Sequence, residues 1–182
     1  LPRWFADTGK VQDMESRLIT CMSTLQGIDP KAILDAQWGR GERANTTALS
    51  TWIAAQSKGM AFNLPQSHAQ ERVMYQVGKR LFYQRGGPHD FSCASCHGDE
   101  GKRIRMQDLP DLRKNPGDGV GFAAWPAYRV SNGQMWSMQH RLNDCYRQQR
   151  FPEPDFGSDV TVALGVFLGV NAKGDKSAAP TI

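Results

Sequence analysis

Residues 93–97 read Cys-Ala-Ser-Cys-His, and this spacing constrains the fold more than any other feature of the 182-residue chain. Two cysteines three positions apart, with a histidine directly after the second, form the signature of c-type haem attachment. In such a site the sulfurs of Cys93 and Cys96 bond to the haem vinyl groups, and His97 reaches the iron from the proximal side. We therefore expect the chain to fold around one covalent haem c and to work outside the cytoplasm.

Two other uses of a CxxC motif fit the sequence less well. A thiol redox site would lie in a βαβ unit, and the sequence shows no such alternation of strands and helices. A zinc site could use Cys93, Cys96, His97 and Cys145 as ligands, but the second paired motif of such sites is missing. Haem attachment remains the favoured interpretation.

Apolar residues recur at helical spacing in several segments, which predicts helices over residues 11–26, 46–58, 68–84, 134–148 and 158–170. Gly27 and Pro30 are typical end signals for the first of these helices. Residues 98–133 are rich in Gly and Pro and lack periodicity, so we expect a long irregular loop there rather than strands. The predicted fold class is all-α.

The composition argues against several classes of protein. Apolar residues make up 40% of the chain and charged residues 22%, as in ordinary globular proteins. The net charge of +4 comes from scattered Lys and Arg, whereas a nucleic-acid-binding protein would carry a dense basic stripe. No stretch approaches the roughly 18 apolar residues of a membrane span. We therefore expect no nucleic-acid partner and no membrane span.

One pattern occurs twice in the chain. Residues 14–21 and 138–145 share the pattern Met-x-x-Arg-Leu-x-x-Cys, which indicates two related halves. The second copy follows the CxxCH motif, whereas no CxxCH precedes the first copy. We therefore predict two cytochrome c-like domains in tandem, namely a haem-less remnant in residues 1–66 and a haem-carrying domain in residues 67–182.

The second axial ligand of the iron has three candidate interpretations. Methionine is common in electron-carrying cytochromes, and Met135 and Met138 lie a plausible distance after the CxxCH motif. Cys145 is the rival, because a thiolate lowers the reduction potential, although it needs nearby positive charge to stay ionised. Arg141 lies one helical turn before Cys145 and can share a helix face with it, and Arg147 follows closely. A buried, inert Cys145 is the third possibility.

Three ordered segments resemble one known family. They are residues 79–97, which run from Lys-Arg-Leu-Phe-Tyr into the CxxCH motif, residues 125–129, Trp-Pro-Ala-Tyr-Arg, and residues 141–145, Arg-Leu-Asn-Asp-Cys. Together they resemble SoxA, the larger subunit of the SoxAX cytochrome of bacterial sulfur oxidation, over nearly the whole chain. The resemblance implies that Cys145 is the distal haem ligand, modified as a persulfide, and that Arg141 lines the substrate channel.

The same resemblance implies an activity, with Cys145 and Arg141 as the catalytic residues. A SoxA-like protein is a periplasmic S-thiosulfotransferase that joins thiosulfate oxidatively to a cysteine of a SoxYZ-like carrier. It forms a heterodimer with a SoxX-like cytochrome, and the haems of the two subunits collect the electrons. Two alternatives stay open: a thiosulfate dehydrogenase that forms tetrathionate, and a plain electron-transfer cytochrome with Met135 or Met138 as axial ligand.

Cys21, in the first copy of the repeat, has no evident partner. With one CxxCH motif, the chain resembles the single-haem branch of the family, in which Cys21 would form a disulfide with a cysteine of a lost haem site. The chain contains no spare cysteine for that bond. An odd cysteine indicates a missing upstream segment, an intermolecular bond or a free thiol.

Overall fold

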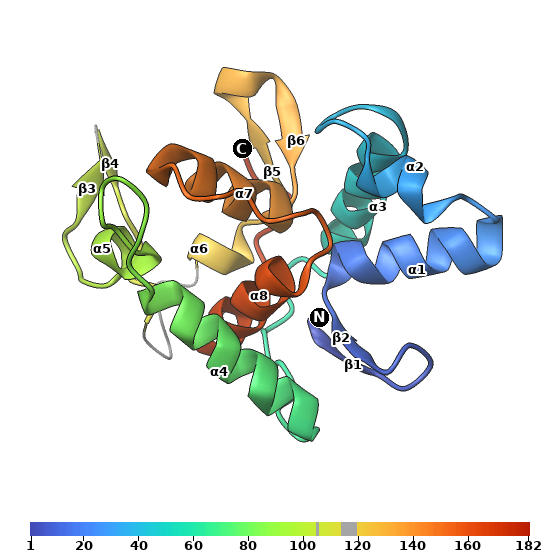
Figure 1. The fold of residues 1–182 in the computed structure, drawn as a ribbon, viewed down its shortest axis with the longest axis horizontal. Helices are drawn as coiled ribbons and strands as arrows, with labels where there is room; N and C mark the ends of the chain where they lie inside the picture. The colour runs from blue at the N-terminus through green and yellow to red at the C-terminus, as the bar shows by residue number, and fades with distance from the viewer. Residues whose placement is uncertain (105, 114–119) are drawn as a thin grey trace.

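Helices form about half of the structure, which is a computed structural model describing residues 1–104, 106–113 and 120–182. They are arranged around a central helix, as Figure 1 shows. The helices are α1 (Met14–Gln26), α2 (Pro30–Leu34), α3 (Gly41–Gln56), α4 (Ala69–Tyr83), α5 (Cys93–His97), α6 (Val120–Ala123), α7 (Met138–Gln149) and α8 (Asp159–Asn171), together with the 3-10 turn η1 (Val130–Asn132). Within the described ranges, no helix is both long and apolar enough to cross a bilayer.

Short strands pair into antiparallel hairpins, which the all-α prediction did not include. They are β1 (Arg3–Phe5) with β2 (Lys10–Gln12), β3 (Arg103–Ile104) with β4 (Gln107–Asp108), and β5 (Ala127–Arg129) with β6 (Gln134–Trp136). The fold prediction is therefore correct for the helices and wrong where it expected only an irregular loop over residues 98–133. Strands of two or three residues are too short to show the alternation of apolar and polar residues from which a strand can be predicted.

The predicted helix bounds hold best where no hairpin intervenes. Helices α4 and α8 agree within one residue with the predictions for residues 68–84 and 158–170. By contrast, α1 begins at Met14 because residues 10–12 pair in β2, and α7 begins at Met138 because residues 134–136 form β6. Helix α3 starts five residues before the predicted residue 46, and α2 was not predicted.

Polar caps fix the first residues of the two helices that carry the repeat. The Asp13 carboxylate accepts the backbone N–H of Ser16 at 2.9 Å, and the Ser16 hydroxyl oxygen accepts the N–H of Asp13 at 2.9 Å. The Ser137 hydroxyl oxygen accepts the N–H of His140 at 3.3 Å at the start of α7. Such caps satisfy backbone N–H groups that have no partner within the helix. Both copies of the repeat therefore begin at the first residue of a helix.

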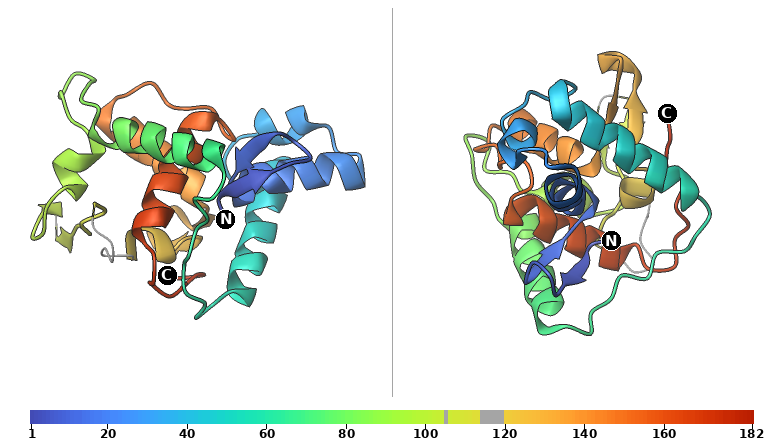
Figure 2. Two further views of the ribbon diagram at one scale, coloured as in Figure 1. Left: turned by 90° about the horizontal axis from the view of Figure 1, so that it is seen from below. Right: turned by 90° about the vertical axis from the view of Figure 1, so that its right-hand side faces the viewer.

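Helix α8 lies at the centre of the core, and α4 packs across it (Figures 1 and 2). Residues 162–168 are apolar on every side and almost fully buried, as expected for a helix enclosed by other elements. At the crossing, a methyl group on Gly78 would lie 2.0 Å from the carbonyl oxygen of Ala163. The two helices are therefore in backbone contact, and this contact fixes the end of α4 from which the chain leads into α5.

The helices of the two repeat copies meet in the interior. The N–H of Gln139 donates to the Glu15 carboxylate at 3.3 Å, and the Gln139 side-chain amide donates to Asp13 at 2.6 Å. Burial, with a smaller effect of the Asp13 charge, raises the pKa of Glu15 to about 7. Helices α1, α2 and α3 lie on one side of α8, and α5 lies on the opposite side, in Figure 1 and in the left view of Figure 2. The division into residues 1–66 and 67–182 stays a prediction.

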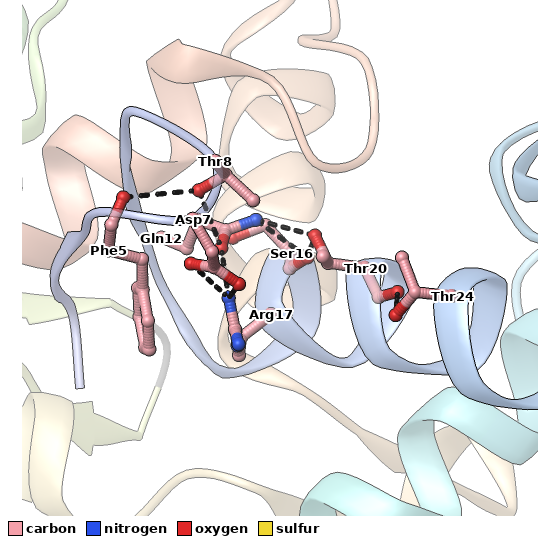
Figure 3. Close-up of polar contacts among 8 residues, drawn as sticks. All are labelled: Phe5, Asp7, Thr8, Gln12, Ser16, Arg17, Thr20 and Thr24. Atoms are coloured by element: carbon pink, nitrogen blue, oxygen red, sulfur yellow. Dashed lines mark hydrogen bonds and ion pairs between the residues drawn. The ribbon is translucent and has the colours of Figure 1, made fainter.

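Figure 3 shows that the arginine of the first repeat copy is already neutralised. The Arg17 guanidinium donates to both carboxylate oxygens of Asp7, at 2.8 and 3.0 Å, and its centre lies 4.2 Å from the centroid of the Phe5 ring. Cys21, one turn further along α1, is a half-buried free thiol. An arginine engaged in this way has little positive charge to offer to an incoming anion.

Candidate haem site

The CxxCH motif forms the short helix α5, directly after α4. Ser92 caps it: its hydroxyl oxygen accepts the N–H of Ser95 at 3.2 Å, and the Ser95 hydroxyl oxygen accepts the N–H of Ser92 at 3.0 Å. One helical turn separates Cys93 from Cys96, so their sulfurs can lie on one face of the helix. Two sulfurs on one face can bond to the two vinyl groups of a single haem.

His97 is held in the orientation that an iron ligand needs. Its Nδ1 lies 3.0 Å from the carbonyl oxygen of Pro110, a bond in which Nδ1–H donates. This bond leaves Nε2 without a proton and available to a metal, which is the usual arrangement for ligating histidines. Burial lowers the pKa of His97, which favours the neutral imidazole. Pro110 was not singled out from the sequence, since nothing local marks a partner thirteen residues away.

Cys145 comes from α7 and lies within electrostatic reach of α5. Burial raises the pKa of Cys93 to about 12, and the charge of Cys145 is the next largest cause. The pKa of Cys145 is itself raised, with burial as the largest cause, while the positive charge of Arg141 opposes the rise. We had expected the arginines to keep this thiol ionised, but burial outweighs their effect. Coordination by a metal is what deprotonates such a thiol.

Arg141 is only partly free to bind an anion. Its Nη1 donates to the Asp144 carboxylate at 3.3 Å, and its guanidinium lies 5.9 Å from the centroid of the Trp125 ring. Asp144 is buried and also accepts a 2.6 Å bond from Arg147. Arg147 therefore pairs with Asp144, a contact that the sequence analysis did not predict. Asp144 raises the pKa of Cys145, after the larger effects of burial and Arg141.

Arg129 is a site residue that the sequence analysis did not select, although it ends the Trp-Pro-Ala-Tyr-Arg segment. It is the last residue of β5 and pairs with Gln134 of β6. Its positive charge, like that of Arg141, opposes the rise in the pKa of Cys145. The charges of two arginines from different elements therefore oppose the rise in the pKa of the same thiol.

The two candidate methionine ligands lie on either side of the start of α7. Met138 packs against the core cluster that contains Phe82 and Leu142, and Met135 is half-buried in β6. The choice between these methionines and Cys145 as axial ligand stays a prediction.

The side chains present fit a covalent haem c. They supply two thiols one turn apart, a histidine with a free Nε2 and a third sulfur on another helix, beside an apolar cluster that includes Phe82, Leu112 and Phe122. Among the described residues, no group of three or more His, Cys, Asp or Glu side chains is arranged to hold a bare metal ion, which argues against the zinc alternative. A CxxCH helix packed on a helical core defines a cytochrome c domain of the c-type, haem-binding class.

Comparison with known proteins identifies the family. Residues 1–62 match the family model of the SoxA/TsdA cytochrome c domain. The L-cysteine S-thiosulfotransferase subunit SoxA of Hydrogenophilus thermoluteolus is 50% identical over 182 residues, which is 100% of this chain and 67% of that protein. The subunit of the same name from Hydrogenobacter thermophilus is 34% identical over 99% of this chain and 65% of its own length.

A solved structure supports the same assignment. The crystal structure of SoxXA from P. pantotrophus superposes with a TM-score of 0.79 at 27% identity, covering 98% of this chain and 61% of that chain. The chain belongs to the SoxA family. It spans about two thirds of the length of the curated relatives above.

Proposed function

We propose that this chain is the catalytic cytochrome subunit of a periplasmic L-cysteine S-thiosulfotransferase. The observation that carries the proposal is that Cys145 and Arg141 lie one turn apart on α7, while the positive charge of Arg141 opposes the rise in the pKa of the Cys145 thiol. A plain electron carrier has no use for a cation beside a half-buried sulfur. Sulfur oxyanions such as thiosulfate, in contrast, are best bound by charge-assisted hydrogen bonds from arginine.

The reaction joins thiosulfate to a carrier cysteine. An S–S bond forms between the outer sulfur of thiosulfate and the cysteine sulfur of a SoxYZ-like carrier, and the S–H bond of that cysteine breaks. The products are the cysteine S-thiosulfonate, one proton and two electrons. Haem c would supply a one-electron acceptor when bound, and a SoxX-like cytochrome in a heterodimer would supply the second.

Each site residue has a role in this scheme. Cys93 and Cys96 would attach the haem, and His97, held by Pro110, would bind its iron. Cys145, as a persulfide, would be a further ligand of the iron and the sulfur that bonds first to thiosulfate, with loss of the two electrons. The carrier cysteine would then take over the thiosulfate group and release the persulfide. Arg141 binds the sulfonate oxygens and orients the substrate.

Replacing Cys145 tests this function, and the first repeat copy offers a matched control. In the haem-loaded complex with its cytochrome partner and carrier, Cys145→Ser should abolish carrier-dependent oxidation of thiosulfate and change the haem absorption spectrum. Cys21→Ser removes the equivalent cysteine of α1 and should leave both unchanged. Mass spectrometry of the intact chain should show one haem and one extra sulfur atom that is absent from Cys145→Ser.

Two results would count against the proposal. Unchanged spectra and activity in Cys145→Ser would favour Met135 or Met138 as the ligand and an electron-transfer role. Formation of tetrathionate by the wild-type protein without any carrier would instead favour a thiosulfate dehydrogenase.

A further inference from the structure

A short loop, residues 109–113, holds His97 at two points, and we call it the His97 loop. The carbonyl oxygen of Pro110 accepts the Nδ1–H of His97 at 3.0 Å, and the N–H of Leu112 donates to the backbone carbonyl oxygen of His97 at 3.0 Å. The loop belongs to no helix or strand, so its backbone groups take partners elsewhere in the fold. The position of the Pro110 carbonyl therefore depends on whatever fixes the His97 loop.

A buried asparagine from the central helix fixes this loop. Asn171 is the last residue of α8, and its side-chain amide nitrogen donates to the carbonyl oxygen of Leu112 at 2.9 Å. Its side-chain oxygen accepts the hydroxyl of Tyr75, on α4, at 3.3 Å. Asn171 is only 6% exposed, so water competes little for these bonds. The amide is bonded at both ends, which fixes its orientation.

These contacts form one series from the helical core to the haem site. The series begins at the Tyr75 hydroxyl and the Asn171 amide, continues through the backbone from Leu112 to Pro110, and ends at Nδ1 of His97. Its first two members lie on α4 and α8, the helices that cross in Figure 1 and are in backbone contact. A rigid pair of helices thus determines where a loop without regular structure places one carbonyl oxygen.

The hydrogen bond from His97 has a definite effect on the chemistry of a bound metal. A histidine that donates its Nδ1–H becomes a stronger donor to the metal through Nε2. A stronger donor favours the oxidised, more positive iron, so the bond lowers the reduction potential of the haem. Movement of the His97 loop that weakens the bond has the opposite effect.

We propose that Asn171 is a positioning residue of the haem site, which holds the His97 loop so that the Pro110 carbonyl accepts the Nδ1–H of His97 and thereby lowers the haem potential. The inference rests on the proposed function only for the role of His97 as an iron ligand. Tyr75 supports Asn171 from α4, and its effect is smaller because it lies one hydrogen bond further from the iron.

The test compares Asn171→Leu, Tyr75→Phe and Thr161→Val in the haem-loaded protein. Leucine keeps the branched shape of asparagine without its donor and acceptor, and phenylalanine keeps the ring of Tyr75 without its hydroxyl. Thr161 is a buried residue in the first turn of α8, at the other end of the helix from Asn171, and its hydroxyl donates to the Ser158 carbonyl at 2.9 Å. Thr161→Val therefore also removes a buried bond to a backbone carbonyl, but away from the His97 loop.

Three measurements are made on each variant. Redox titration gives the haem potential. Hydrogen exchange over residues 107–113 reports how often the bond from the Leu112 N–H to the His97 carbonyl opens. Unfolding in denaturant gives the overall stability, so that a local effect on the loop can be separated from a general loss of stability.

We expect Asn171→Leu to raise the haem potential and to speed exchange of the Leu112 N–H. Loss of a group bonded directly to a metal ligand changes metal affinity or activity by about 10- to 100-fold, and Asn171 acts at one remove. The expected change in the equilibrium constant for reduction is therefore about 3- to 10-fold, or about 30–60 mV. Tyr75→Phe should give a smaller rise, and Thr161→Val should keep the wild-type potential although it unfolds more easily.

Two outcomes would overturn the proposal. One is a wild-type potential in haem-loaded Asn171→Leu, and the other is an equal rise in Thr161→Val, because the potential would then follow overall stability. If Asn171→Leu takes up no haem, Tyr75→Phe decides: a raised potential supports the proposal and a wild-type potential overturns it. Failure of the proposed function is recognised separately, because absence of carrier-dependent thiosulfate oxidation in the wild type leaves the comparison of potentials intact.

Discussion

Because α4 and α8 are in backbone contact, we expect opposite effects on stability when either of two glycines, both inside helices, is replaced by alanine. At Gly78 an added methyl group would lie 2.0 Å from the carbonyl oxygen and 2.6 Å from the carbonyl carbon of Ala163. Ordinary contact begins at 3.4 Å, so the helices must move apart by about 1.4 Å. Backbone atoms cannot rotate away as a side chain can. At Gly165, on α8, the nearest atom to an added methyl group is Cγ of Pro2 at 3.7 Å, which is ordinary contact.

The magnitudes follow from two opposing effects. Replacing glycine by alanine inside a helix stabilises it by about 1 kcal/mol. Overpacking a close-packed interior costs about 1–3 kcal/mol, and a clash with backbone atoms takes the upper part of that range, about 2–3 kcal/mol. We therefore expect Gly78→Ala to lower the free energy of unfolding by about 1–2 kcal/mol and Gly165→Ala to raise it by up to about 1 kcal/mol. For a chain of this length, these changes correspond to a Tm lower by about 2–8 °C and higher by about 2–4 °C, respectively.

The assay is unfolding of the haem-loaded protein, followed by far-ultraviolet circular dichroism in both heat and denaturant, with haem content measured for each variant. Equal denaturant slopes would show that the two variants unfold the same structure. If Gly78→Ala proved as stabilising as Gly165→Ala, the two helix backbones could not be in contact at Ala163, and the packing argument would be refuted.

Two further predictions concern stability. Glu15 has a pKa of about 7 in the folded chain and an ordinary value in the unfolded chain, so its favourable contribution is complete at low pH and is lost as pH rises through 7. Relative to Glu15→Gln, the wild type should therefore lose up to about 3 kcal/mol between pH 4.5 and 8, seen as a falling Tm difference; a constant difference would contradict this. Ser92→Ala removes the cap of α5 and should cost about 1 kcal/mol in denaturant unfolding, whereas Ser67→Ala, outside any cap, should cost little.

Several elements of the fold were readable from the sequence because their signals are local. The helical periodicity of residues 68–84 and 158–170 predicted α4 and α8 to within one residue. The predicted first residues of α1 and α7 and the expected absence of strands in residues 98–133 were wrong, because short hairpins pair residues whose own sequence carries no strand pattern. In those places pairing between segments overrides local preference.

The site, too, was predictable from the sequence only in part. The CxxCH motif identified Cys93, Cys96 and His97, and the repeat identified Arg141 and Cys145. Their mutual placement, and the choice of ligand at the iron, depend on how α4 and α8 position α5 and α7 and are beyond any local pattern. The sequence also overestimated how strongly the arginines ionise Cys145, because the burial of a side chain is a property of the folded chain.

The sequence by itself determined the kind of chemistry, since covalent haem attachment requires a fixed spacing of three residues. Only the tertiary structure decided which groups surround that chemistry: the Pro110 carbonyl on His97 and the charge of Asp144 between two arginines. The physical reason is the distance over which each kind of interaction acts. A motif acts over a few bonds of chain, whereas electrostatics and burial act through space between residues that the fold brings together.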